Sequence, residues 1–166
     1  MVAVALLAGA CTPTYDWRDV RPEGGDLTLL FPCSPDRYAR SVTLAGEATS
    51  MRMLVCTAGG TTYALSALAG APGGDLAARL DRLREAAVAN VNGDAPRPRP
   101  WAAAPELAAA GASRLETRGK LPDGSAVIEH AVFFSRGTTA YQASVVGASP
   151  NDESVETFLA SIKPTR

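Results

Sequence analysis

The stretch Ala126-Val-Ile-Glu-His-Ala-Val-Phe-Phe-Ser135 decides the fold of this chain of 166 residues. Successive side chains of a strand point to opposite faces, and in this stretch both faces carry apolar groups. One face holds Val127, Glu129, Ala131 and Phe133, and the other holds Ile128, His130, Val132 and Phe134. This pattern is typical of a strand that is covered on both sides. We therefore expect further structure to cover both of its faces.

More strands are predicted before and after this stretch. The turn sequences Pro122-Asp-Gly124 and Arg136-Gly137 connect it to alternating stretches at 113–121 and 138–147. Earlier stretches of strand character lie at 27–31, 38–44, 47–56 and 61–67, with turns at Gly46-Glu47 and Ala58-Gly-Gly60. Their order predicts an antiparallel sheet of about six strands in two meanders.

Two helices are predicted to cover this sheet. The first follows Asp75, a favoured N-cap residue, and ends at Asn92-Gly93. Its apolar residues recur at helical spacing: Leu76, Leu80, Leu83, Ala87, Val88 and Val91. The second begins within Ser149-Pro-Asn-Asp152, which resembles a capping arrangement with Pro150 at the first helical position. It stops at Lys163-Pro164. An antiparallel sheet covered by a mid-chain helix and a C-terminal helix is an α+β fold.

Three segments lack strand or helix periodicity. Residues 12–25 carry proline, glycine and charges, so we interpret them as a tether that docks through Tyr15 and Trp17 onto a single domain at 26–166. The alternating Pro/Arg stretch that leads to Trp101 favours a polyproline conformation on the surface. The alanine-rich piece at 102–110, interrupted by Pro105, fits either a short helix or an ordered loop.

Residues 1–11 form an uncharged apolar run that ends in small residues and Cys11. The run is too short to cross a bilayer as a helix, which takes about 20 residues, and it matches the core of a secretory signal. Leu7-Ala-Gly-Ala-Cys11 resembles a bacterial lipobox, which implies cleavage before Cys11 and a lipid on that cysteine. Ala8-Gly-Ala10 equally fits the site of ordinary signal peptidase. We expect a bacterial envelope protein that faces the periplasm, lipid-anchored or, alternatively, soluble there.

Cys33 and Cys56 each lie beside a predicted strand. In an exported protein a disulfide between them can persist, and it would connect the first strand to a later one. Closing the loop between Cys33 and Cys56 contributes about 3 kcal/mol to the stability of the fold in the loop-entropy model. A metal site formed with His130, the one histidine, is the alternative. No C-x-x-C motif supports that alternative.

The charge balance and the motifs narrow the function. The formal net charge is -1 and 20% of the residues are charged, so the chain has no basic footprint for nucleic acid. The sequence has no G-x-S-x-G, no phosphate-binding loop and no paired carboxylates that would indicate acid–base catalysis. We therefore expect neither an enzyme nor a cofactor.

A resemblance adds to this interpretation. The strand that ends in Phe31-Pro32, the run Ala131-Val-Phe-Phe-Ser-Arg-Gly-Thr-Thr-Ala-Tyr141 and the closing Glu156-Thr-Phe-Leu-Ala-Ser-Ile162 look like the layout of PsbP-like and DcrB-like proteins. The resemblance covers roughly residues 26–163. It implies a small exported sheet-and-helix domain, often a lipoprotein, and it transfers no catalytic residue.

Two functional hypotheses follow. The first is a non-enzymatic envelope lipoprotein that binds a protein partner or supports an assembly. The second is a small-ligand or metal-binding domain, or a weak hydrolase, with a pocket near His130 and Tyr141. The absence of clustered titratable groups in the sequence favours the first.

Overall fold

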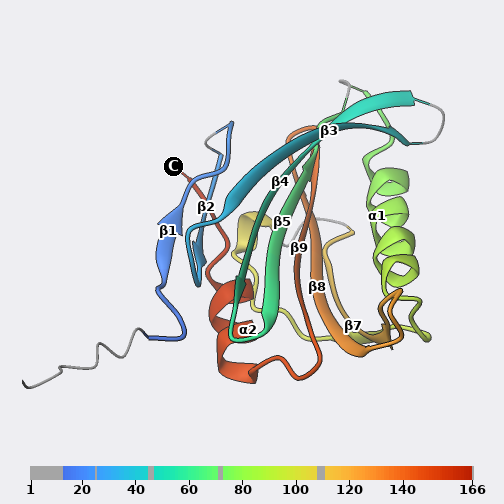
Figure 1. Cartoon of the computed structure of the whole chain (residues 1–166). Coiled ribbons are helices and arrows are strands. Elements are labelled where there is room, and N and C mark those ends of the chain that lie inside the picture. Colours follow the sequence, from blue (N-terminus) through green and yellow to red (C-terminus); the bar gives the residue numbers. More distant parts are fainter. Residues whose placement is uncertain (1–12, 25, 45–46, 71–72, 108–110, 166) are drawn as a thin grey trace, which may run out of the picture.

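The main sheet contains seven antiparallel strands in the order β3-β4-β5-β9-β8-β7-β6. A computed structural model describes residues 13–24, 26–44, 47–70, 73–107 and 111–165 (Figure 1). The strands of the main sheet are β3 (Asp36–Leu44), β4 (Glu47–Ala58), β5 (Thr61–Leu68), β6 (Arg97–Arg99), β7 (Ser113–Lys120), β8 (Ala126–Arg136) and β9 (Thr139–Gly147). The predicted meanders correspond to β3-β4-β5 and β7-β8-β9, and they join where β5 pairs with β9. The short strand β6, which was not predicted as a strand, adds to the edge of the second.

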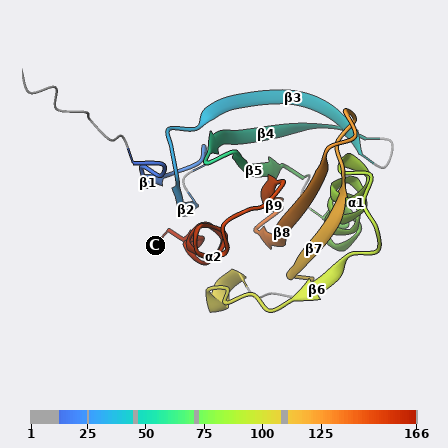
Figure 2. The same ribbon diagram turned by 60° about the horizontal axis from the view of Figure 1, so that its bottom comes forward.

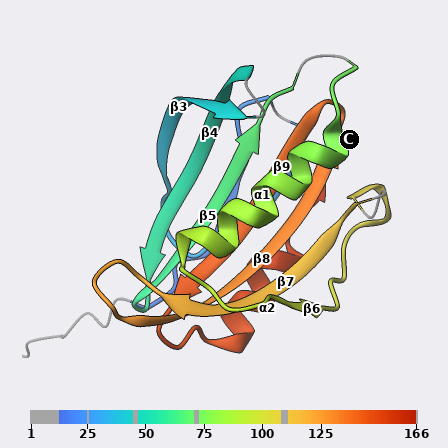
Figure 3. The ribbon, with the colours of Figure 1, turned by 90° about the vertical axis from the view of Figure 1, so that its right-hand side faces the viewer.

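The α+β prediction is confirmed, because two helices pack on this sheet from opposite sides (Figures 1 and 3). α1 (Leu76–Asn90) begins as predicted, with the Asp75 side chain accepting a hydrogen bond from Ala78 N at 2.9 Å. It buries Leu80, Leu83 and Ala87 against one face of the sheet. α2 (Asp152–Ala160) lies on the other face.

Pro150 lies outside α2, so its predicted place as the first helical residue is wrong. The N-cap is Asn151, whose side chain accepts a hydrogen bond from Ser154 N at 2.9 Å. An asparagine side chain caps the first turn directly, and the helix therefore starts at Asp152, two residues beyond the expected position.

The predicted strand at 27–31 belongs to a second sheet. This strand, β2 (Leu27–Phe31), lies between β1 (Arg18–Val20) and β10 (Lys163–Pro164) in the order β1-β2-β10. The turn that contains Pro32 and Pro35 separates it from β3, because proline interrupts a strand ladder. The segment that we interpreted as a tether therefore includes β1, and Tyr15 and Trp17 pack against the core.

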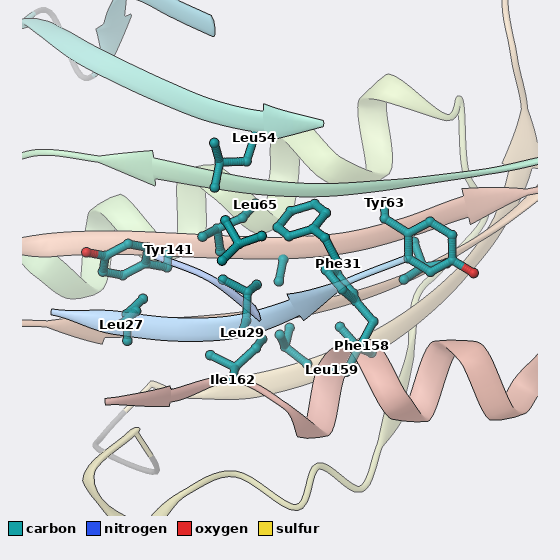
Figure 4. Close-up of a cluster of buried hydrophobic side chains, with 14 of the residues drawn as sticks. Leu27, Leu29, Phe31, Leu54, Tyr63, Leu65, Tyr141, Phe158, Leu159 and Ile162 are labelled. Atoms are coloured by element: carbon teal, nitrogen blue, oxygen red, sulfur yellow. The ribbon is translucent and has the colours of Figure 1, made fainter. Parts of the chain in front are cut away.

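The larger core lies between the main sheet and the layer formed by β2 and α2 (Figure 4). Phe158 of α2 stands edge-on to both Phe31 and Tyr63, at centroid distances of 5.1 and 5.4 Å. The Tyr63 hydroxyl shares a buried hydrogen bond of 2.7 Å with the Ser154 hydroxyl. A smaller core lies under α1 and includes Phe133 and Leu68. β8 is thus covered on both faces, as its sequence predicts.

The other two segments without periodicity also contain short elements. Arg97–Arg99, expected in a polyproline conformation, forms the short edge strand β6 against β7. An edge position tolerates Pro98, because the missing N–H can face away from the neighbouring strand. In the alanine-rich piece, Pro105–Leu107 forms the short 3-10 helix η1, while residues 108–110 lie outside the described residues.

Candidate binding surface at the β3 edge

β3 is a long open edge of the main sheet (Figure 2). All nine of its residues pair with β4 on one side. On its other side, no backbone hydrogen bond joins it to any other residue in the part of the chain that the structure describes. Unpaired backbone groups along such an edge are a template for an added strand.

The side chains of β3 are largely exposed. Tyr38, with 56% of its surface accessible, is the exposed large hydrophobic residue among those described. By the register with β4, Tyr38 and Arg40 lie on the face that α1 covers, opposite Met53 and Met51. Arg37 and Ala39 lie on the α2 face. The edge thus presents an aromatic ring and the Arg40 guanidinium on one face and the Arg37 guanidinium on the other.

The disulfide fixes the beginning of this edge. Cys33 lies in the turn before β3 and Cys56 lies near the end of β4, and the two are bonded with a Cα–Cα distance of 6.1 Å. This confirms the predicted bond between Cys33 and Cys56. With both sulfurs in this bond, neither is available as a thiolate ligand for the alternative metal site with His130. The described residues contain no cluster of potential metal ligands.

A cavity of about 200 Å³ opens on the α2 face beside this edge. Its charged lining comes from Arg37 of β3, Arg52 of β4 and Glu23 of the β1–β2 connection. Its apolar lining includes Leu54 and Leu65, from β4 and β5. Arg52 Nη1 lies 3.3 Å from Glu23 Oε2, and both side chains are largely exposed. The Arg37 side chain forms no ion pair or hydrogen bond within the described part of the chain.

Tyr141 belongs to β9, and its side chain lies close to this cavity on the α2 face of the main sheet. It is in register with Ala67, a lining residue of the cavity on β5. Its hydroxyl donates to both carboxylate oxygens of Asp26 at 3.1 Å, and its ring stacks on Phe134 at a centroid distance of 5.1 Å. Burial and the nearby Asp26 carboxylate raise the pKa of Tyr141. Tyr141 therefore remains a neutral hydrogen-bond donor.

His130 lies on the same face as Tyr141 but at another level of the sheet. Tyr141 is opposite Phe134 and His130 is opposite Val145, so four positions, about 13 Å, separate them along the strands. Burial lowers the pKa of His130, and its Nδ1 has no hydrogen-bond partner among the described residues. Neither residue lines the cavity at β3, and a ligand pocket near His130 and Tyr141 stays a prediction.

The charged residues around His130 connect α2 to the sheet. Arg114, which is 7% exposed, donates two hydrogen bonds to the carboxylate of Glu156, at 3.1 and 2.6 Å. The Arg114 guanidinium lowers the pKa of Glu156. Glu116, in register with His130, forms ion pairs with Arg99 and Arg118 at 3.4 and 3.7 Å. These carboxylates and guanidinium groups are paired within the fold, while Arg114 Nε, like His130 Nδ1, has no hydrogen-bond partner among the described residues.

Sequence reasoning missed the buried Glu129. On the α1 face of β8 its side chain is 4% exposed, and burial raises its pKa from 4.5 to about 7. Gln142 donates to its Oε1 at 3.4 Å, while Oε2 has no partner among the described residues. The available sequence signal for this burial was that Glu129 shares its face of the strand with the apolar residues Val127, Ala131 and Phe133.

Comparisons with known proteins show a partial structural similarity and no named family. No family model matches the chain, and no curated protein matches it. A protein of unstated function from Bacteroides thetaiotaomicron VPI-5482 has a similar crystal structure, with a TM-score of 0.49 and 10% sequence identity. The match covers 89% of this chain and 48% of that protein, so this chain spans about half the length of that protein.

The location of the protein is indicated by its disulfide. A bond between Cys33 and Cys56 points to an oxidising compartment outside the cytoplasm. Among the described residues, no helix has the length and apolar character needed to span a membrane. Cys11 and the rest of the leader lie outside the described residues.

Proposed function

We propose that this protein is an exported, non-enzymatic envelope domain that binds a protein partner by adding a strand of that partner to β3. In this proposal the lipid on Cys11 anchors the domain to a bacterial membrane with its sheet facing the periplasm. The disulfide supports export. The layout resembles that of PsbP-like and DcrB-like envelope domains, and we include that kinship in the proposal.

The open edge of β3 is the observation that carries the proposal. Nine residues of extended backbone lie at the margin of the sheet and contain no proline. The opposite margin differs, because β6 has three residues and Pro98 is in the middle. Proteins commonly protect sheet edges with short strands and proline. β6 has both forms of protection and β3 has neither, so an added strand is expected at β3.

Site-specific photo-cross-linking tests this proposal. A photoreactive phenylalanine analogue replaces Tyr38 in the native host, and the same analogue at Arg82, on α1, is the matched control. We expect a defined adduct from position 38 and none from position 82. The purified complex is then examined by amide hydrogen exchange, in which β3 amides that exchange rapidly in the free protein should become protected.

The proposal is wrong if position 38 gives no specific adduct, or if the complex leaves exchange in β3 unchanged. Proline substitutions supply a second measurement. Neighbouring amides of an edge strand point alternately toward and away from β4. Of Ala39→Pro and Arg40→Pro, the variant that keeps the native circular dichroism spectrum should lose the adduct, because proline removes the N–H that faces the partner.

A further inference from the structure

We infer that the cavity beside β3 receives an acidic side chain, a glutamate by its reach, from the strand that adds to this edge. The inference rests on the proposed function, because the acidic group arrives as part of that strand. It goes further by naming the chemistry that selects the partner: a carboxylate on a short apolar stem, held between Arg37 and Arg52.

The position of the cavity relative to the edge supports this inference. Ala39 lines the cavity from β3 and lies directly opposite Arg52 on β4. A residue of an added strand that lies opposite Ala39 continues the same row across the sheet. Strands lie about 4.8 Å apart, so its Cβ would be about 10 Å from that of Arg52. Because only the methyl group of Ala39 stands between them, a glutamate and an arginine side chain can meet over it.

The size of the cavity favours a single side chain over a free cofactor. Small-molecule sites generally have volumes of about 300–1,000 Å³. This cavity, at about 200 Å³, is smaller than that range. One side chain with a few carbon atoms fills such a space, and the apolar walls from Leu54 and Leu65 suit its stem.

The charges of the cavity favour an acidic occupant. Two arginines and one glutamate line it, which leaves one positive charge in excess. The pair between Arg52 and Glu23 is exposed, with 44% and 67% of the two side chains accessible, so it contributes little and can be exchanged. Arg37, on the edge strand itself, brings a guanidinium that can bind a carboxylate through two parallel hydrogen bonds.

Three synthetic peptides test the inference. They share the sequence Thr-Val-Thr-X-Thr-Val-Thr, with blocked ends and Glu, Gln or Lys at X. Each is titrated into the ¹⁵N-labelled protein while the arginine Nε–H and backbone signals are recorded. We expect the Glu peptide to bind at least fivefold more tightly than the Gln peptide and to shift the Nε–H signals of Arg37 and Arg52. The Lys peptide should be the weakest.

Matched variants locate the effect. Arg37→Gln and Arg52→Gln should each remove most of the preference for Glu over Gln. Arg40→Gln should keep it, because Arg40 lies on the same strand but on the face that α1 covers. Free glutarate should shift these signals only at concentrations far above those of the Glu peptide. If glutarate binds as tightly as the Glu peptide, the occupant is a free acid and the inference is wrong.

The outcomes separate this inference from the proposed function. Equal affinities for the Glu and Gln peptides, with β3 amides still protected, overturn the acidic subsite and leave strand addition intact. Binding of none of the three peptides also overturns the inference, and cross-linking at position 38 then judges the proposed function by itself.

Discussion

At the scale of single residues, Glu129 sets a pH dependence within the fold. Its carboxyl group is buried on a face that is otherwise largely apolar, and one of its oxygens has no partner among the described residues. Burial favours the neutral acid, which is why the pKa of Glu129 rises from 4.5 to about 7. A group with a raised pKa in the folded state contributes its full stability below its unfolded pKa. That stability is lost as the pH rises through the folded value.

The free energy of unfolding should therefore fall by about 2 kcal/mol between pH 5 and pH 8 because of this group. Glu129→Gln keeps the shape and the contact with Gln142 while removing the titration. We expect the variant to be more stable than the wild type at pH 8 and to differ little at pH 5. Urea unfolding at the two pH values measures both quantities. An unchanged gap between wild type and variant across this range would contradict the prediction.

At the scale of elements, the end of α1 is attached to β7 by a close backbone approach. Lys120 N donates to Val91 O at 2.6 Å, and Asp94 N donates to Arg118 O at 2.9 Å. A Cβ placed on Gly119 would overlap the carbonyl oxygen of Val91. The glycine is therefore required by the approach of the residues that follow the helix to the strand.

Gly119→Ala should destabilise the protein by about 2 kcal/mol or more, because backbone must move to admit the methyl group. Lys120→Ala, at the next and exposed position, is the control and should change the stability by less than about 0.5 kcal/mol. Thermal unfolding followed by circular dichroism compares the two variants. Equal melting temperatures would show that the junction between α1 and β7 adjusts without loss.

The elements also show which features the sequence could predict. α1 was predictable because Asp75 and the recurring leucines are local signals, and β8 because apolar side chains alternate on both of its faces. The separation of β2 from the main sheet was not predictable, because strand pairing depends on partners as distant in sequence as Lys163.

In the candidate site, too, local features could be predicted and long-range contacts could not. The Cys33–Cys56 bond could be predicted, because the sequence shows where each cysteine lies beside a strand. The cavity could not, because Glu23, Arg37 and Arg52 meet only after β3 and β4 pair and the β1–β2 connection folds beside them. Alternation likewise places Glu129 on a face without showing how deeply that face is covered.

At the scale of the whole molecule, the disulfide restricts the unfolded chain. It joins residues 23 positions apart, and a closure of this length contributes about 3 kcal/mol in the loop-entropy model. The paired variant Cys33→Ser and Cys56→Ser should lose about that much stability. Chemical denaturation of the variant and of the oxidised wild type measures the loss, with dithiothreitol-treated wild type as the control. A reduced wild type as stable as the oxidised protein would contradict the prediction.

The second sheet can be completed only after the residues of β10 have been synthesised. β2 pairs on one side with β1, nearby in sequence, and on the other with Lys163 and Pro164, and Thr165 N donates to Asp26 O at 3.0 Å. During synthesis, a nascent chain can assemble both meanders while β2 still lacks one neighbour. The contacts of β2 with residues 163–165 therefore cannot form until those residues have been made, and contacts of such long sequence separation are slow to form.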